Sequence, residues 1–275
     1  MSSVRKRHSF STAVLAAVLV LFYAPILVVA VNALNQDDTL NSWGGGTLRW
    51  FRQILADGRV RGDFGTSALI AAATTILSVA IALTTVLAAR RLPHGGRTAF
   101  NMITYARLML PEVVTAVGLF LLFRRFGIEM GLVPVIIGHT LFCSAYATVV
   151  VQARYAAVSG RFSEAAADLG AGPWRTFRRV TLPLLAPALV VAGLLSFTFS
   201  FDDVVSSVFL SGSSVETLPM LMMGMIRQRV TPEVNAIAVA VMTITFAVVA
   251  LVVAATSVRA AGGVRSSRDG ATDDE

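Results

Sequence analysis

Charged residues are scarce in this chain. Asp, Glu, Lys and Arg make up 14% of its 275 residues, whereas a soluble domain carries about a quarter. Hydrophobic residues make up 55%, and the mean hydropathy is +0.72. This composition excludes an ordinary soluble domain and indicates a membrane protein.

Cysteine and histidine are nearly absent, and so are the common catalytic motifs. Cys143 stands alone in an apolar run, so no intrachain disulfide can form and we expect a small buried side chain. Among the three scattered histidines, His139 is expected to make an interhelical hydrogen bond rather than to bind a metal. The sequence contains no phosphate-binding loop, no H-E-x-x-H pair and no G-x-S-x-G turn. These absences disfavour a membrane enzyme and imply that the chain itself holds no cofactor.

Six apolar runs are long enough to cross a bilayer as helices, which takes about 20 residues. They are 10–34, 66–89, 102–123, 132–151, 186–210 and 234–258. The first run follows a short basic segment, but it is too long for a signal peptide and lacks a small-residue cleavage site, so we expect it to be retained. We predict an all-α membrane protein with a six-helix transmembrane domain over 10–258. Segment 1–9 is then a cytoplasmic amino terminus, and 259–275 a disordered cytoplasmic tail.

The positive charges predict the orientation of these helices. Most Lys and Arg residues fall on one side if both termini are cytoplasmic, and such residues resist translocation. The net charge of +7 does not indicate nucleic-acid binding, because the cations are distributed along loops at a membrane face.

The loop between the fourth and fifth predicted helices, about 152–185, is longer than a simple connection requires. Ser163 is a candidate N-cap for a short alanine-rich helix, and Gly170, Gly172 and Pro173 are expected to end that helix. A second short helix is expected over 174–180. The loop is therefore predicted to be a cytoplasmic helix, turn and helix, which either binds a partner or lies idle on the membrane.

The spacing within this loop resembles the EAA signature of ABC importer permeases, which reads E-A-A, three residues, G, nine residues, I, one residue, L-P. The matching residues are Glu164, Ala165, Ala166, Gly170, Leu182 and Pro183, with Val180 in place of the isoleucine. The resemblance implies the type I importer permease fold. It also implies a coupling helix that docks on a separate ATPase, which binds the ATP and Mg.

By the same resemblance, each conserved position of the signature has a role. Glu164 makes polar contacts on the ATPase surface, Ala165 and Ala166 allow close packing, and Gly170 forms the turn. The energy source then lies on another chain.

Two adjacent acids, Asp202 and Asp203, interrupt the fifth apolar run. A carboxylate at membrane depth costs about 2.5–3.5 kcal/mol on insertion scales, so such residues normally face a polar cavity or a partner. Adjacent helical positions differ by about 100°, so the two side chains cannot point at one spot. Two interpretations remain open. In one, an acid lines a path while the other caps or pairs; in the other, the helix ends near Phe201 and the pair caps the next segment.

Glu112 is a third acid within an apolar run, directly after Pro111. It either pairs with Arg107, five residues earlier, or contributes to a path. Acids at two depths without matching intramembrane cations favour a cationic solute over an anionic one.

The run "LSFTFSFDDVVSSVFLSG" and the later "TPEVNA" are similar to the second membrane subunit of the spermidine/putrescine permeases. The similarity extends to "NALNQ" and "TLRWFRQIL" nearer the amino terminus. It implies a polyamine importer of the bacterial inner membrane, with a second permease subunit, two ATPase subunits and an extracytoplasmic solute-binding protein. The candidate substrate-path residues are Asp202, Asp203, Glu112, Ser200 and Trp50.

Some alternatives stay open at this stage. Trp50 is equally compatible with an ordinary interfacial anchor. ABC importers for iron, phosphonate or other small solutes share the EAA loop. A stand-alone channel or proton-coupled carrier would leave that loop unexplained.

Overall fold

The computed structural model describes the backbone of residues 2–269. It describes the side chains of residues 12–254 except 13, 159–161, 163, 164 and 167. Apart from an isolated bridge between Asn35 and Gly46, the regular structure in this range is helical, which confirms the all-α prediction. The elements are α1 (Ser2–Asn32), α2 (Arg49–Ala56), α3 (Gly58–Ala89), α4 (His94–Met109), α5 (Glu112–Arg125), α6 (Leu132–Asp168), α7 (Pro173–Thr176), the π-helical turn η1 (Phe177–Thr181), α8 (Leu182–Asp202), α9 (Val205–Leu210), α10 (Leu218–Gln228) and α11 (Pro232–Asp269).

The chain divides into two compact units. Unit 1 comprises Met1–Arg61 and Met222–Val248, and unit 2 comprises Gly62–Leu221 and Val249–Glu275. Within the described residues, five helical segments are long and apolar enough to cross a membrane, and the bent pair of α4 and α5 makes a sixth if it is one span. Each of the six predicted runs therefore corresponds to a candidate span.

The third predicted helix is not continuous, which corrects the prediction for 102–123. It is broken between α4 and α5, whose axes differ by 101°. Leu110 has an extended backbone with φ −71° and ψ 128°, and Pro111 follows it. The ring of a proline clashes with a helical conformation of the residue before it, so Pro111 provides the physical reason for the break.

Three other predicted boundaries were wrong. The fifth predicted helix ends at Asp202 instead of continuing to Leu210. Ser163 does not cap a separate helix, because α6 is continuous to Asp168. The carboxyl-terminal tail is helical up to Asp269, and the rest of that predicted tail lies outside the described residues.

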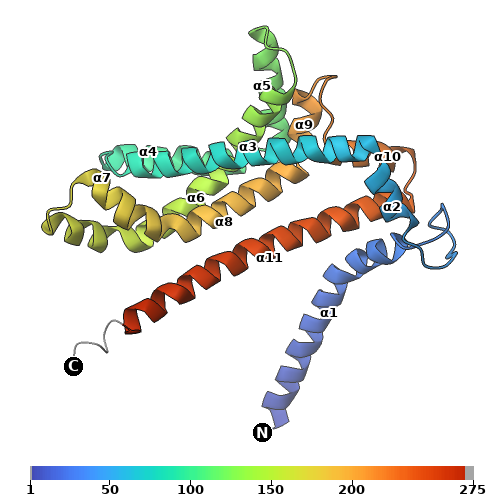
Figure 1. The fold of residues 1–275 in the computed structure, drawn as a ribbon, viewed down its shortest axis with the longest axis horizontal. Helices are drawn as coiled ribbons and strands as arrows, with labels where there is room; N and C mark the ends of the chain where they lie inside the picture. Colours follow the sequence, from blue (N-terminus) through green and yellow to red (C-terminus); the bar gives the residue numbers. More distant parts are fainter. Residues whose placement is uncertain (1, 270–275) are drawn as a thin grey trace. The chain divides into compact units, whose positions relative to one another are not determined.

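The core of unit 2 is built on small residues. Ala82 of α3, Ala147 of α6 and Ala192 of α8 are completely buried in one cluster, with Leu185 and Val151 beside them. Small side chains let helix backbones approach closely, which is how helices associate in a membrane without a hydrophobic driving force between them. These three helices lie side by side in Figure 1.

A second cluster joins α3, α5, α6 and α9 through Ile70, Phe123, Val135 and Leu210. Gly138 of α6 permits this packing, because a Cβ atom there would lie 2.5 Å from Cδ1 of Leu210, which is itself fully buried. The close approach brings α9 against the first turns of α6.

Gly138→Ala is expected to destabilise the protein by about 1–3 kcal/mol, because the added methyl group overpacks a buried contact. Gly118→Ala is the matched control, since nothing lies within 4 Å of its Cβ position in α5. Replacing a mid-helix glycine there is expected to be neutral or mildly stabilising. Thermal unfolding of the two purified variants in detergent measures the difference, and equal midpoints would contradict the packing described here.

In unit 1, Asn35 organises the segment between α1 and α2. Its Nδ2 donates to the carbonyl oxygens of Thr39 (3.1 Å) and Ser42 (2.7 Å), and its Oδ1 accepts from the backbone N–H of Gly44 (3.0 Å). The indole Nε1 of Trp50 donates to the carbonyl oxygen of Asn35 at 2.7 Å. Asn35 therefore holds the loop through its side-chain amide and the start of α2 through its main-chain carbonyl.

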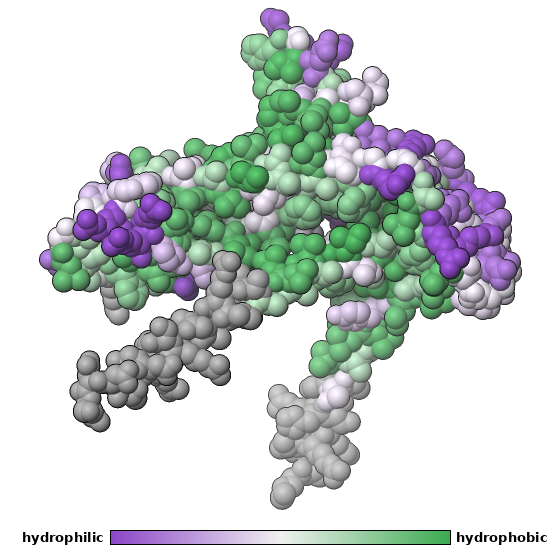
Figure 2. All heavy atoms as spheres, viewed as in Figure 1, coloured by the Kyte–Doolittle hydropathy of each residue, from purple (hydrophilic) through white to green (hydrophobic). Residues whose placement is uncertain are grey.

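The exposed surface of the helices in unit 2 is largely apolar. Ile76, Leu121 and Leu69 are more than half exposed. Figure 2 shows green, apolar atoms over the lengths of α3 and α8, with purple, hydrophilic atoms at the end of unit 2 that carries α7. This distribution suits helices surrounded by lipid.

Candidate functional site

Two helix breaks meet in unit 2 and bring acidic side chains together. Glu112 begins α5 directly after the break at Pro111, and Asp203 lies in the break between α8 and α9. Ser206 lies between them: its hydroxyl donates to Oε1 of Glu112 at 3.3 Å, and its backbone N–H donates to Oδ1 of Asp203 at 2.9 Å. Two carboxylates thus approach one serine inside an apolar protein.

Asp203 is a buried capping residue. Its backbone is extended, with φ −72° and ψ 112°, so it cannot continue α8. Its carboxylate accepts the N–H of Ser206 in the first turn of α9, which is the interaction of a helix cap, and its carbonyl oxygen accepts the hydroxyl of Ser207 at 2.8 Å. The expectation that this helix ends at the acids and that one of them caps the next segment agrees with this geometry.

Asp202 differs from its neighbour. It is the last residue of α8, and it is exposed on the isolated chain, whereas Asp203 is 8% exposed. Because Asp203 is engaged within the subunit, Asp202 is the acid that remains free to meet a solute or another subunit.

His139 of α6 contacts both helices that flank the break between α8 and α9. Its imidazole is buried, with Nδ1 2.8 Å from the hydroxyl of Ser200 in α8 and Nε2 3.2 Å from the hydroxyl of Ser207 in α9. Nε2 also lies 3.2 Å from Oδ2 of Asp203. The expected interhelical hydrogen bonds of His139 are confirmed. Ser200, predicted as a path residue, is therefore buried as a partner of this histidine.

Glu112 does not pair with Arg107 in the described part of the chain, where no ion pair joins them within 4 Å. Its carboxylate contacts Ser206 instead. Arg107 lies in α4 with its guanidinium 5.8 Å from the ring centre of Phe142. Arg107 is also an intramembrane cation that the argument from charge alone had left out.

Trp50 does not present a free ring face. It belongs to unit 1, its side chain is buried, and the guanidinium of Arg49 lies 4.3 Å from its ring centre. The ring is therefore engaged in packing within its own unit, which disfavours a role for Trp50 in a substrate path.

Sequence reasoning missed that Ser206 and Ser207 join the acids to His139. The signal available was the series of hydroxyl residues around the two aspartates, which does not identify their partners. Those partners come from α5 and α6, 94 and 68 residues away in the sequence.

The loop after α6 has the geometry of a Schellman C-cap. Gly170 has φ +74°, and the N–H of Ala171 donates to the carbonyl oxygen of Ala166 at 3.0 Å, across the turn. Ala165 is exposed and Ala166 half-buried, while the side chain of Glu164 lies outside the described side chains. Gly170 thus forms the turn, as the sequence predicted.

The second half of the loop is helical from its start. α7 begins at Pro173, passes through η1 and continues as α8, so the predicted short helix over 174–180 is the first part of a longer helical segment. Leu182 and Pro183 are the first residues of α8. The loop exposes Leu169 (88%) and Trp174 (71%), two large apolar side chains that are free to contact a partner.

Comparisons with known proteins agree with this architecture. The family described as binding-protein-dependent transport system inner membrane component matches residues 80–261. A bacterial ABC transporter involved in the import of the acidic polysaccharide alginate has a chain of similar fold, with a TM-score of 0.70 at 14% identity over 90% of this chain and 94% of that chain. The fold and the loop thus define an ABC importer permease, a non-catalytic, multi-pass component of the inner membrane.

Two curated relatives narrow this class. The putrescine transport system permease protein PotI of Escherichia coli (strain K12) is 34% identical, over 78% of this chain and 79% of its own. The spermidine/putrescine transport system permease protein PotC of Haemophilus influenzae is 35% identical, over 83% and 89% respectively. The chain belongs to the spermidine/putrescine permeases of the binding-protein-dependent family. Its family implies a complex with a binding protein and an ATPase.

Proposed function

We propose that this chain is one of two permease subunits of an ATP-driven importer and conducts polyamines past Asp202 and Glu112. The relatives named above are permeases for putrescine and for spermidine and putrescine, and they match most of the chain. Two ATPase subunits, a second permease and an extracytoplasmic binding protein complete the proposed assembly. Both termini are cytoplasmic in this proposal, in accord with the distribution of Lys and Arg.

The observation that carries the choice of a cation is the approach of two carboxylates to Ser206. The two distances are 3.3 Å from Oε1 of Glu112 to the hydroxyl oxygen and 2.9 Å from Oδ1 of Asp203 to the backbone nitrogen. Neighbouring carboxylates repel each other, and an ammonium group beside them would remove that repulsion. Asp202, one residue away and exposed, supplies a further negative charge for an elongated molecule with several amines.

The helices suggest how the loop could act on this site. α6 runs without a break from Leu132 to Asp168, and it carries His139 near one end and Ala165 and Ala166 near the other. The segment from α7 to α8 returns along it and carries Ser200. Since His139 and Ser200 share a hydrogen bond of 2.8 Å, displacement of the loop by an ATPase would reach the acid cluster through two packed helices.

Transport by the reconstituted complex tests this proposal. With ATP inside proteoliposomes and the binding protein outside, labelled putrescine or spermidine is expected to accumulate, and excess unlabelled polyamine to compete. Iron and phosphonate salts are expected not to compete. ATP-dependent uptake of another solute, with no uptake of either polyamine, would reject the polyamine assignment and leave the family membership intact.

A further inference from the structure

Two adjoining cavities lie at the end of unit 2 where α3 meets α4. The first has a volume of about 460 Å³, and its polar lining comes from Arg90, Arg97, Asn101, Gln152 and Tyr155. The second, of about 920 Å³, lies beside α7 and shares Arg90 with the first. Neither belongs to the acid cluster described above.

Two residues that line the first cavity carry buried polar atoms without partners. Tyr155 is 7% exposed, yet its hydroxyl has no hydrogen-bond partner. Gln152 donates from Nε2 to Oδ1 of Asn101 at 2.8 Å, but its own Oε1 is also unpartnered and buried. Both atoms have almost no solvent-accessible area, so rotation of either side chain toward the cavity would give it the hydrogen bond that buried polar groups almost always make.

The positive charge of this cavity is not neutralised within the described side chains, where no carboxylate lies within 4 Å of Arg90 or Arg97. The guanidinium of Arg90 lies 4.9 Å from the ring centre of Tyr155. A guanidinium held over an aromatic face keeps its N–H edge free for bidentate contact with a phosphate. The cavity therefore favours an anion and would repel a polyamine.

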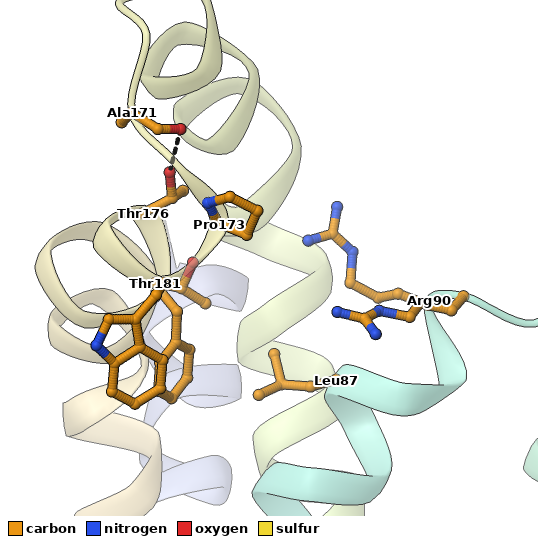
Figure 3. A pocket seen from close by; sticks show the side chains of 9 residues that line it. Leu87, Arg90, Ala171, Pro173, Thr176 and Thr181 are labelled. Carbon is orange, nitrogen blue, oxygen red and sulfur yellow. Dashed lines mark hydrogen bonds between the residues drawn. The ribbon is translucent and has the colours of Figure 1, made fainter.

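The surroundings favour a phospholipid over a soluble anion. Arg90 follows directly after the last residue of α3, a candidate membrane span, and the cavity is lined by Val86 and Phe100 as well as by cations. The second cavity, drawn in Figure 3, has Arg90 and Leu87 on one side and Pro173 and Thr181 on the other.

Trp174 also lines the second cavity. It is 71% exposed and packs on Phe177 with ring centres 5.6 Å apart. Tryptophan is enriched where lipid headgroups meet the hydrocarbon region, and basic pockets between helices at a membrane face bind anionic headgroups.

We propose that this cavity binds the headgroup of an anionic phospholipid of the phosphatidylglycerol type. Arg90 and Arg97 contact the phosphate. Rotation of Tyr155 and Gln152 toward the cavity lets the Tyr155 hydroxyl donate to the phosphate and Oε1 of Gln152 accept a hydrogen bond from a glycerol hydroxyl. The acyl chains lie along the apolar residues at the ends of α3 and α4. A lipid at this place fills the space beside α7, whatever solute the transporter carries.

Native mass spectrometry of the purified complex tests the site, with phosphatidylglycerol and phosphatidylcholine as probes. The unmodified complex is expected to retain phosphatidylglycerol preferentially. Arg90→Gln with Arg97→Gln should weaken its binding by about tenfold or more, because two charge-assisted hydrogen bonds are lost. Tyr155→Phe, which removes only the unpartnered hydroxyl, should weaken it by a factor of about three.

The matched control is Arg124→Gln with Arg125→Gln, which removes the same charge from two exposed positions at the end of α5 and should leave lipid binding unchanged. Equal loss in this control would mean diffuse attraction and overturn the proposal. So would unchanged lipid binding in the Arg90 and Arg97 variant, or binding of inorganic phosphate there without phosphatidylglycerol. If that variant lost the ATPase but kept its lipid, the cavity would be a protein contact instead.

Discussion

Polyamine uptake is expected to fall about 100-fold when Asp202→Asn is combined with Glu112→Gln. Each change removes one charge while keeping the size and polarity of the side chain. Loss of a charge-assisted contact costs ~1.5 kcal/mol or more, and 1.4 kcal/mol is a factor of ten. The measurement is the initial rate of ATP-dependent putrescine uptake into proteoliposomes containing the full complex.

Two further variants distinguish a loss of uptake caused by a missing charge in the path from a loss caused by damage to the fold. Glu129→Gln makes the same change as Glu112→Gln at an exposed residue between α5 and α6, and it should leave uptake unaltered. Asp203→Asn keeps an acceptor for the N–H of Ser206, since asparagine caps helices as well as aspartate does, so the fold is expected to stay intact while uptake falls about tenfold from the lost charge. A large loss with Asp203→Asn and none with Asp202→Asn would reverse the roles assigned to the two acids.

Gly170→Pro is expected to abolish uptake and its coupling to ATP hydrolysis. The backbone at this position has φ +74°, and proline is fixed near −65°, so the turn after α6 cannot form as it stands. The alanine-bearing end of α6 and the start of α7 would then no longer face an ATPase together. Uptake and substrate-stimulated ATP hydrolysis, measured on the same preparation, show whether the two activities separate.

Alanine at two glycines of the same loop provides a finer test. At Gly170 an alanine must adopt the left-handed conformation, which costs about 1–2 kcal/mol. Gly172 has φ −65°, and nothing lies within 4 Å of its Cβ position, so alanine is tolerated there. Gly170→Ala should therefore reduce coupled uptake measurably, and Gly172→Ala should not.

Normal uptake by the Gly170→Pro complex would show that coupling does not depend on this turn, and the coupling proposal would fail. Glu164→Ala tests the polar contact separately, because the backbone of α6 accommodates alanine without strain. It should lower the ATPase activity stimulated by substrate while the complex remains assembled.

The turn in the EAA loop is a feature that neighbouring residues in the sequence determine. Glycine after an alanine-rich segment predicted the end of a helix and a turn, and Gly170 makes that turn with a positive φ, which glycine adopts without strain. Composition and run length likewise predicted an all-helical membrane protein, because a bilayer requires long apolar helices with satisfied backbone groups. These features depend on neighbours in the sequence.

The acid site depended on the tertiary fold. The sequence predicted one helix over 102–123, and it indicated neither the break at Pro111 nor the 101° bend between α4 and α5 that carries Glu112 to Ser206. The sequence also did not indicate that Asp203 is buried as a helix cap while Asp202 is exposed. The reason is physical: hydropathy and turn chemistry are local, so the sequence alone predicted the membrane helices and the glycine turn after α6. Which acids meet is decided by close packing of helices distant in the chain, through contacts such as Gly138 against Leu210 that no local pattern encodes.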